Sequence, residues 1–219
     1  MNYFSTFPKI LSTDYNNNKI VLTNLMKRAI IPENLSKNPL IYYSYNIKDG
    51  ETPDLIATKY YGDPSRYWLI MFANQMLDPQ WDWPLNQNLW PKYIVEKYKN
   101  DAANSYNISA NTILPYQVLS YTQTKINQYL KIISTTDNLS SNTTTINVSI
   151  NSDTYNSLST GVTTQTFPAG YNVTQSITKT QQTLYEYEEN LNESKRNIFL
   201  INEIYASEIE LQLQKLMRK

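Results

Sequence analysis

The stretch from residue 41 to residue 62 constrains the fold most, because it contains the signals of a strand, a turn and a complete helix. In residues 41–47, apolar or aromatic side chains alternate with more polar ones, which is the two-residue period of a half-buried strand. Asp49-Gly50 supplies turn residues, and Thr52 is suited to cap the start of a helix. Gly62 is suited to end that helix. We therefore expect a strand, a turn and a helix in this order.

Two more helices are expected to complete an ordered domain at residues 40–99. An Asp-Pro pair beginning at residue 63 signals the start of the second helix, in which residues 67–72 place large apolar side chains at helical spacing. The Asp-Pro and Trp-Pro pairs within residues 78–84 predict an ordered but irregular loop. A third helix is expected over residues 86–99. These elements place the chain in the α+β class.

The regions before and after this domain differ from it in composition. Residues 1–39 mix short apolar runs with polar turns, which predicts an extended N-terminal arm with one short strand or helix at residues 21–28. Residues 100–182 are dominated by Ser, Thr and Asn, and between Lys131 and Lys179 the only charged residues are two aspartates. Because Thr, Ile, Val and Tyr alternate there, we expect a polar β-rich insertion rather than a disordered linker.

The C-terminal region, residues 183–219, is charged again. Residues 184–188 alternate like a strand, and residues 190–195 suit a turn. A second strand is expected at residues 198–201, and a helix from Glu203 onwards, with basic residues near its C-terminal end. The region is therefore predicted to be a strand pair followed by a helix.

Composition excludes several classes of function. The chain contains no cysteine and no histidine, so disulfides, thiolate metal sites and histidine-based catalysis are impossible. Lys and Arg total 19, as do Asp and Glu, and this zero net charge predicts no nucleic-acid partner and no membrane association. No signal peptide and no apolar run of ~20 residues is present, so we expect synthesis in the cytoplasm. We expect no cofactor and no metal.

The aromatic side chains between residues 42 and 90 allow two interpretations. They could stack on sugar rings, or they could form a core and a protein interface. We favour the second, because aromatic residues at strand or helix spacing usually pack in a core. The Lys195-Arg196 pair could contact an acidic partner or lie in a solvated turn, and we favour the turn. The predicted interface residues are Tyr42, Tyr45, Tyr61, Tyr67, Trp81, Trp83, Trp90, Lys195 and Arg196.

Three carboxylates could in principle form a glycosidase pair. They are Glu51, Asp78 and Asp82, and glycoside hydrolysis needs two carboxyl groups on either side of the scissile bond. Acidic residues beside Pro and Gly are more often turn formers and helix caps. We therefore predict turn and cap roles, no catalytic residue and no enzymatic activity.

The order of elements resembles a LysM module, which is a small βααβ unit. The resemblance rests on Tyr43 to Thr52 for the first strand and turn, Leu55 to Asp63 for the first helix, and Tyr67 to Asn74 for the second. It implies an α+β fold with a LysM-like βαα(β) central domain. LysM modules bind N-acetylglucosamine polymers and usually close with a second strand. This sequence instead continues into a Trp-rich loop and a helix, so we predict that the closing strand is missing and that sugar binding is lost.

The continuation resembles the LysM-containing baseplate wedge protein family of contractile-tailed bacteriophages. The similar segments are Asp78 to Leu85, the helix with Lys92-Tyr93-Ile94 and Lys97-Tyr98, residues 185–198 and, more weakly, residues 2–9 and 22–28. The resemblance implies a structural protein of the virion tail baseplate that docks on other baseplate wedge proteins and helps join neighbouring wedges. Copies of the chain itself in a six-fold assembly are a further implied partner. The alternative function is a peptidoglycan- or N-acetylglucosamine-binding LysM module.

Overall fold

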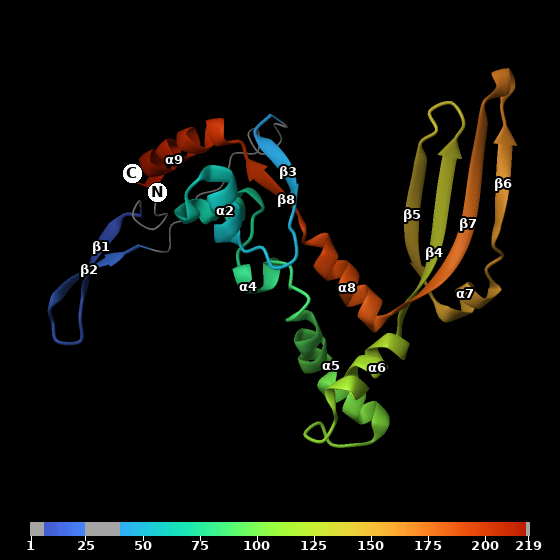
Figure 1. Ribbon diagram of the computed structural model, residues 1–219, viewed down its shortest axis with the longest axis horizontal. Coiled ribbons are helices and arrows are strands. Elements are labelled where there is room, and N and C mark those ends of the chain that lie inside the picture. Colours follow the sequence, from blue (N-terminus) through green and yellow to red (C-terminus); the bar gives the residue numbers. More distant parts are fainter. Residues whose placement is uncertain (1–6, 25–39, 218–219) are drawn as a thin grey trace. The chain divides into compact units, whose positions relative to one another are not determined.

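The computed structural model of the chain describes residues 7–24 and 40–217 (Figure 1). It contains helices and strands throughout, so the predicted α+β class is confirmed. The chain divides into two compact units. Unit 1 is Met1–Gln87 with Asn192–Lys219, and unit 2 is Asn88–Leu191. The predicted division into four domains, with boundaries at residues 40, 100 and 183, stays a prediction.

Unit 1 is built around a βααβ arrangement. Its two strands pair antiparallel, and two α-helices with an intervening 3-10 turn follow the first strand, while unit 2 lies in the sequence between these helices and the second strand. A short helix follows the second α-helix, and a long helix follows the last strand (Figure 1). The elements are β3 (Tyr42–Asn46), α2 (Pro53–Tyr61), η2 (Pro64–Arg66), α3 (Tyr67–Ala73), α4 (Pro79–Asp82), β8 (Asn197–Ile201) and α9 (Glu203–Met217).

The predicted start and end of the first helix are confirmed. Thr52 is extended at the position before α2, and Gly62 follows it with a φ of 69°. Glycine adopts this left-handed conformation without steric cost, and its N–H donates to the Thr58 carbonyl. Asp63 caps the next element, since its carboxylate accepts from the Ser65 N–H at 2.8 Å. The predicted second helix therefore begins as the 3-10 turn η2.

Strand β8 closes the βααβ arrangement, so the prediction of a missing closing strand was wrong. The register runs from Tyr42 opposite Ile201 to Asn46 opposite Asn197. The Asn46 and Asn197 side chains are also hydrogen-bonded at 2.9 Å, although they lie 151 positions apart. The strand was predicted at residues 198–201. Its pairing with β3 could not be inferred, because no local sequence pattern identifies which distant strand a given strand pairs with.

The core of unit 1 lies between this ribbon and its helices. The side chains of Ile56, Leu69 and Ile70 are buried against Leu200 and Ile201. Large apolar side chains removed from water in this way are the main source of stability of the unit. The core also includes Phe7, Ile41, Ile47, Ala57, Tyr61, Trp68, Ile198, Ala206 and Leu213.

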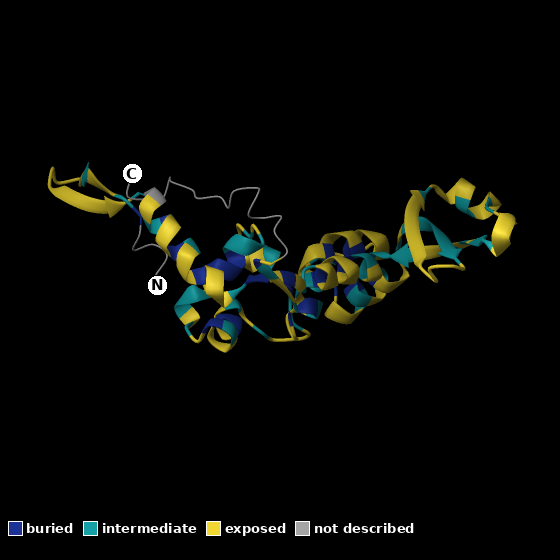
Figure 2. Ribbon diagram, turned by 90° about the horizontal axis from the view of Figure 1, so that it is seen from above, coloured by how far each residue is buried: buried dark blue, intermediate teal, exposed yellow. Residues whose placement is uncertain are grey.

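The described part of the N-terminal arm is an antiparallel hairpin of β1 (Lys9–Thr13) and β2 (Lys19–Thr23). We predicted one short strand or helix at residues 21–28. The structure instead forms two strands, and residues 25–28 lie outside the described residues. The two strands of the hairpin expose their side chains in Figure 2.

Unit 2 contains a four-stranded antiparallel sheet with the strand order β5-β4-β7-β6. The expectation of a strand-rich insertion is thereby confirmed for residues 126–182. The inner strands are half-buried and the outer strands are exposed. Figure 2 accordingly draws this sheet in teal and yellow, without the dark blue of buried residues. The elements are α5 (Trp90–Tyr106), α6 (Pro115–Thr124), β4 (Ile126–Asp137), β5 (Thr143–Ile150), α7 (Ser152–Ser157), β6 (Gly161–Thr166), η3 (Pro168–Gly170), β7 (Asn172–Thr183) and α8 (Leu184–Ser194).

Two secondary-structure predictions in and beside this unit were wrong. Residues 100–124 are largely helical. Ile94, Tyr98 and Ala102 are buried at intervals of four residues, so the helical pattern of α5 continues past residue 100. The strand predicted at residues 184–188 and the turn that followed it form the helix α8. Alternating tyrosines suggested a strand there, but abundant glutamates favour a helix.

Glu188 of α8 is buried and binds three side chains of α5. It accepts hydrogen bonds from the Lys97 ammonium at 2.7 Å, the Tyr98 hydroxyl at 2.7 Å and the Tyr93 hydroxyl at 3.3 Å. Burial and the adjacent Glu188 carboxylate raise the pKa of Tyr98. Trp90 joins the same helix pair, since its indole N–H donates to the Tyr185 hydroxyl at 3.0 Å.

Candidate protein-interaction surface

The turn between β3 and α2 is held by Glu51. Its carboxylate accepts from the Tyr45 hydroxyl at 2.8 and 2.9 Å and from the Lys48 N–H at 2.9 Å. Its backbone carbonyl accepts from the Trp83 indole N–H at 2.9 Å. Tyr45 and Trp83 were predicted to face a partner. Both are half-buried, and their polar groups are bound within the chain.

Glu51 gives unit 1 a pH dependence of defined sign. Burial raises its pKa, but the Lys48 N–H, the Tyr45 hydroxyl and the Lys59 ammonium together hold it below the ordinary 4.5. A carboxyl with a lowered folded-state pKa stabilises the fold above its unfolded pKa, and this contribution disappears as the pH falls through the folded pKa.

We therefore expect the urea midpoint of unit 1 to decrease between about pH 5 and about pH 3. Tryptophan fluorescence is a suitable measurement, because three of the four tryptophans lie in unit 1. Glu51→Gln should remove part of this decrease, and the exposed Asp101→Asn should not. An unchanged pH profile in Glu51→Gln would contradict the prediction.

The Lys195-Arg196 pair lies in a turn, as predicted, but the turn is half-buried and both side chains have partners within unit 1. The Lys195 ammonium donates to the Trp81 carbonyl at 2.6 Å. The Arg196 guanidinium donates to the Glu193 carboxylate at 2.8 Å and lies 3.6 Å from the Asp49 carboxylate. These contacts connect the end of α8 to the β3–α2 turn and to α4, which is a structural role.

Two further predicted interface residues are buried. The Tyr61 hydroxyl donates to the Ile201 carbonyl at 2.9 Å, and burial raises its pKa. Trp90 lies in unit 2, against Tyr93 and Tyr185. Their rings stabilise the two units and leave little surface for a partner.

Several aromatic side chains of unit 1 are largely exposed, and we call four of them, Tyr43, Tyr67, Trp81 and Phe199, the exposed aromatic residues. Tyr67 and Trp81 were predicted, whereas Tyr43 and Phe199 were not. Tyr42, the remaining predicted residue, is half-buried with its ring edge-on to Phe199 at 6.1 Å. The strand period grouped Tyr43 with Ile41, Tyr45 and Ile47, and of these four only Tyr43 is exposed. The exposure of Tyr43 and Phe199 depends on where the neighbouring elements lie, so no sequence signal identified these two residues.

The carboxylates Asp78 and Asp82 have the predicted turn and cap roles. Asp78 caps α4 by accepting from the Gln80 N–H at 3.0 Å. Asp82 accepts from the Leu77 and Asp78 N–H groups, each at 3.0 Å, and these bonds lower its pKa. Across residues 7–24 and 40–217, no group of three or more acidic side chains could hold a metal ion. In the same residues, no helix is long and apolar enough to cross a membrane.

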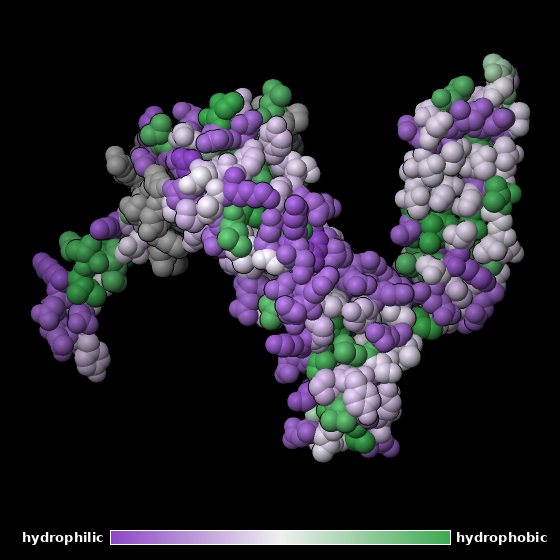
Figure 3. Space-filling model, in the orientation of Figure 1, coloured by the Kyte–Doolittle hydropathy of each residue, from purple (hydrophilic) through white to green (hydrophobic). Residues whose placement is uncertain are grey.

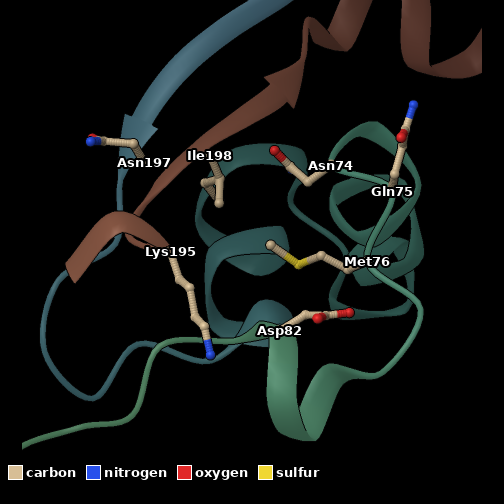
Figure 4. A pocket seen from close by; sticks show the side chains of 7 residues that line it. All are labelled: Asn74, Gln75, Met76, Asp82, Lys195, Asn197 and Ile198. Atoms are coloured by element: carbon tan, nitrogen blue, oxygen red, sulfur yellow. The ribbon is translucent and has the colours of Figure 1, made fainter. Parts of the chain in front are cut away.

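A cavity of about 250 Å³ lies between the end of α3, α4 and the start of β8 (Figure 4). Its acidic group, Asp82, and its ammonium group, Lys195, are already engaged by backbone partners. The cavity is therefore a weak candidate for chemistry. The remaining lining residues are Asn74, Gln75, Met76, Asn197 and Ile198.

These features define a protein of mixed helices and strands that exposes aromatic and apolar side chains on folded elements. The model of a family described as Base plate wedge protein 53 matches residues 8–155, so the chain belongs to the base plate wedge protein 53 family. Baseplate wedge protein gp53 of Enterobacteria phage T4 is 30% identical over 80 residues, which are 36% of this chain and 41% of that protein. The chain thus matches less than half the length of this curated relative. Family membership gives the chain a structural role in the phage baseplate.

Proposed function

We propose that the chain is a non-catalytic docking protein of a contractile-tail baseplate. It binds other baseplate wedge proteins and helps join neighbouring wedges, with further copies of the chain present in a six-fold assembly. Family membership supports this function. The βααβ arrangement of unit 1, closed by β8, supports a LysM-like central unit that serves as a docking block.

The observation that carries the proposal is the apolar hairpin β1–β2. Paired residues of a hairpin share a face, so Ile10 and Leu22 lie on one face and Leu11 and Val21 on the other. All four side chains are exposed, and Leu11 is 74% accessible to solvent. Figure 3 shows hydrophobic residues gathered on this hairpin, in green. An isolated two-stranded hairpin is marginally stable in water, so a partner that covers both faces would stabilise it.

Reconstitution with the other purified wedge proteins of the same phage tests this function. We expect a stable complex that is weakened at least about tenfold by the double substitution Leu11→Ser and Val21→Ser, because each removes apolar contact area. Leu139→Ser is the matched control, since Leu139 is also 74% exposed but lies in unit 2. A chain that never associates with these proteins would overturn the proposal.

Sugar binding is the alternative, and the contacts around Glu51 argue against it. Sugar recognition combines aromatic stacking with free polar groups, yet the Tyr45 hydroxyl and the Trp83 indole N–H are bound within the chain. We expect no change in tryptophan fluorescence on titration with chitooligosaccharide to millimolar concentration, and no retention on peptidoglycan. Saturable quenching that Trp81→Ala abolishes would instead favour a sugar-binding module.

A further inference from the structure

Strand β5 is an open edge of the sheet in unit 2. It stands at one end of the strand order and pairs with β4 alone among the described strands. Edge strands are normally protected from pairing by a charged residue, a proline or a bulge. β5 has the sequence TTTINVSI, which contains no charge and no proline. Its register with β4 is continuous from Ile150 opposite Tyr129 to Thr143 opposite Thr136, so it contains no bulge.

The side chains of β5 form an apolar row that stops at the edge. Ile146 is opposite Ile133 of β4, which is opposite Ile177 of β7, so the three isoleucines share one face of the sheet. Val148 lies on the same face, two residues along β5. Ile146 is 55% exposed and Val148 is 40% exposed. A strand added beside β5 would continue this row and cover both side chains.

We propose that β5 pairs antiparallel with β5 of a second copy of this chain, about a two-fold axis at Asn147. This register places Ile146 opposite the partner's Val148 twice, and Thr145 opposite the partner's Ser149 twice. On one face Ile146 then meets Val148, with Thr144 opposite Ile150 at the ends. On the other face hydroxyl groups meet on both sides of Asn147, and such cross-strand pairs stabilise sheets. Two-fold pairing uses the same surface on both copies, as most homodimers do, so it applies to the free chain and not to neighbouring copies around a six-fold axis, which meet head to tail.

The absence of charge on β5 favours a second copy as its partner, and the small area of one strand pair indicates a weak dimer. Symmetry brings identical side chains close together, so a strand with no charged residue pairs with itself without like-charge repulsion. One strand pair buries less than the ~800 Å² per partner of a standard interface, so we expect dissociation in the micromolar range or weaker. The opposite edge strand, β6, fits less well. It has six residues, begins at Gly161 and carries one aliphatic side chain, Val162.

A single-cysteine variant tests the register, because the chain contains no cysteine. Asn147→Cys places two thiols opposite each other at the axis, within the range that a disulfide can bridge after small adjustment. We expect a covalent dimer under mild oxidation, formed at least about tenfold faster than with Thr164→Cys on β6. An equimolar mixture of Ile146→Cys and Val148→Cys should give mainly the mixed dimer.

Sedimentation velocity of the unsubstituted chain provides the second readout. We expect a concentration-dependent shift toward dimer that Asn147→Lys abolishes, because two ammonium groups would meet at the axis, and that Thr164→Lys leaves intact. A chain that stays monomeric at millimolar concentration would overturn the proposal. Equal cross-linking rates for Asn147→Cys and Thr164→Cys would do the same, as would cross-linking of Asn147→Cys only to another wedge protein.

Discussion

Leu200→Ala is expected to destabilise unit 1 by about 2–5 kcal/mol, which is the usual cost of truncating a buried leucine to alanine. Leu200 is 1% exposed on β8, in the core shared with Ile56 and Leu69. Because β8 completes the βααβ arrangement, the loss should also appear in β3. Urea unfolding followed by tryptophan fluorescence would give the size of the effect. Hydrogen exchange read by mass spectrometry would locate it, since a chain of two units need not unfold in one transition.

Phe199→Ala is the matched control for this prediction. Phe199 is the preceding residue of the same strand, but it is one of the exposed aromatic residues. Its backbone bonds to Asn74 do not depend on the ring. We expect a change within about 1 kcal/mol. Equal destabilisation by the two substitutions would mean that β8 does not present Leu200 to the core as described.

Glu188→Ala is expected to destabilise the α5–α8 pair of unit 2 by about 2–3 kcal/mol. The substitution removes the carboxylate that accepts from the Lys97 ammonium and the Tyr98 hydroxyl. Tyr98 is buried, so its hydroxyl would lose its partner without gaining water. The Lys97 side chain is 40% exposed and can be rehydrated, which limits the total cost.

The measurement is hydrogen exchange across α5 and α8. Glu189→Ala is the control, because it makes the same change of residue type at the next, exposed position of α8. Glu188→Gln should fall between the two variants, since the amide still offers an oxygen acceptor but no charge. Equal protection in Glu188→Ala and Glu189→Ala would show that the buried network contributes nothing measurable.

Sequence signals predicted individual elements well where the interactions that form the element involve residues only a few positions apart. Thr52 and Gly62 mark the start and end of α2, because cap conformations depend on the residue at that position. Asp78 and Asp82 have the turn and cap roles expected beside Pro79. The same reasoning failed over α8, where two alternating tyrosines resembled a strand although Glu188 and Asn192 are buried at helical spacing.

The candidate site was predictable only in part. Tyr67 and Trp81 were identified and are exposed, but Tyr61 and Trp90 are buried and Tyr43 and Phe199 were missed. An aromatic side chain serves a core and an interface equally well, so its residue type does not decide between them. Whether the side chain belongs to a core or to an interface depends on which neighbouring side chains cover it.

The sequence by itself determined most of the helices and strands, because hydrophobic period, helix caps and turn residues act within a few positions. Residues 100–124 and the helix α8 were exceptions. The sequence also determined what chemistry is excluded, since a chain without cysteine or histidine lacks those groups in any fold. Only the tertiary structure decided that β8 pairs with β3 and completes the arrangement that begins at residue 41. It alone decided that Lys195 and Arg196 hold that arrangement together, through the Trp81 carbonyl and the Asp49 carboxylate, instead of facing solvent. Both outcomes depend on contacts between residues more than 100 positions apart, and packing, not local preference, selects such contacts.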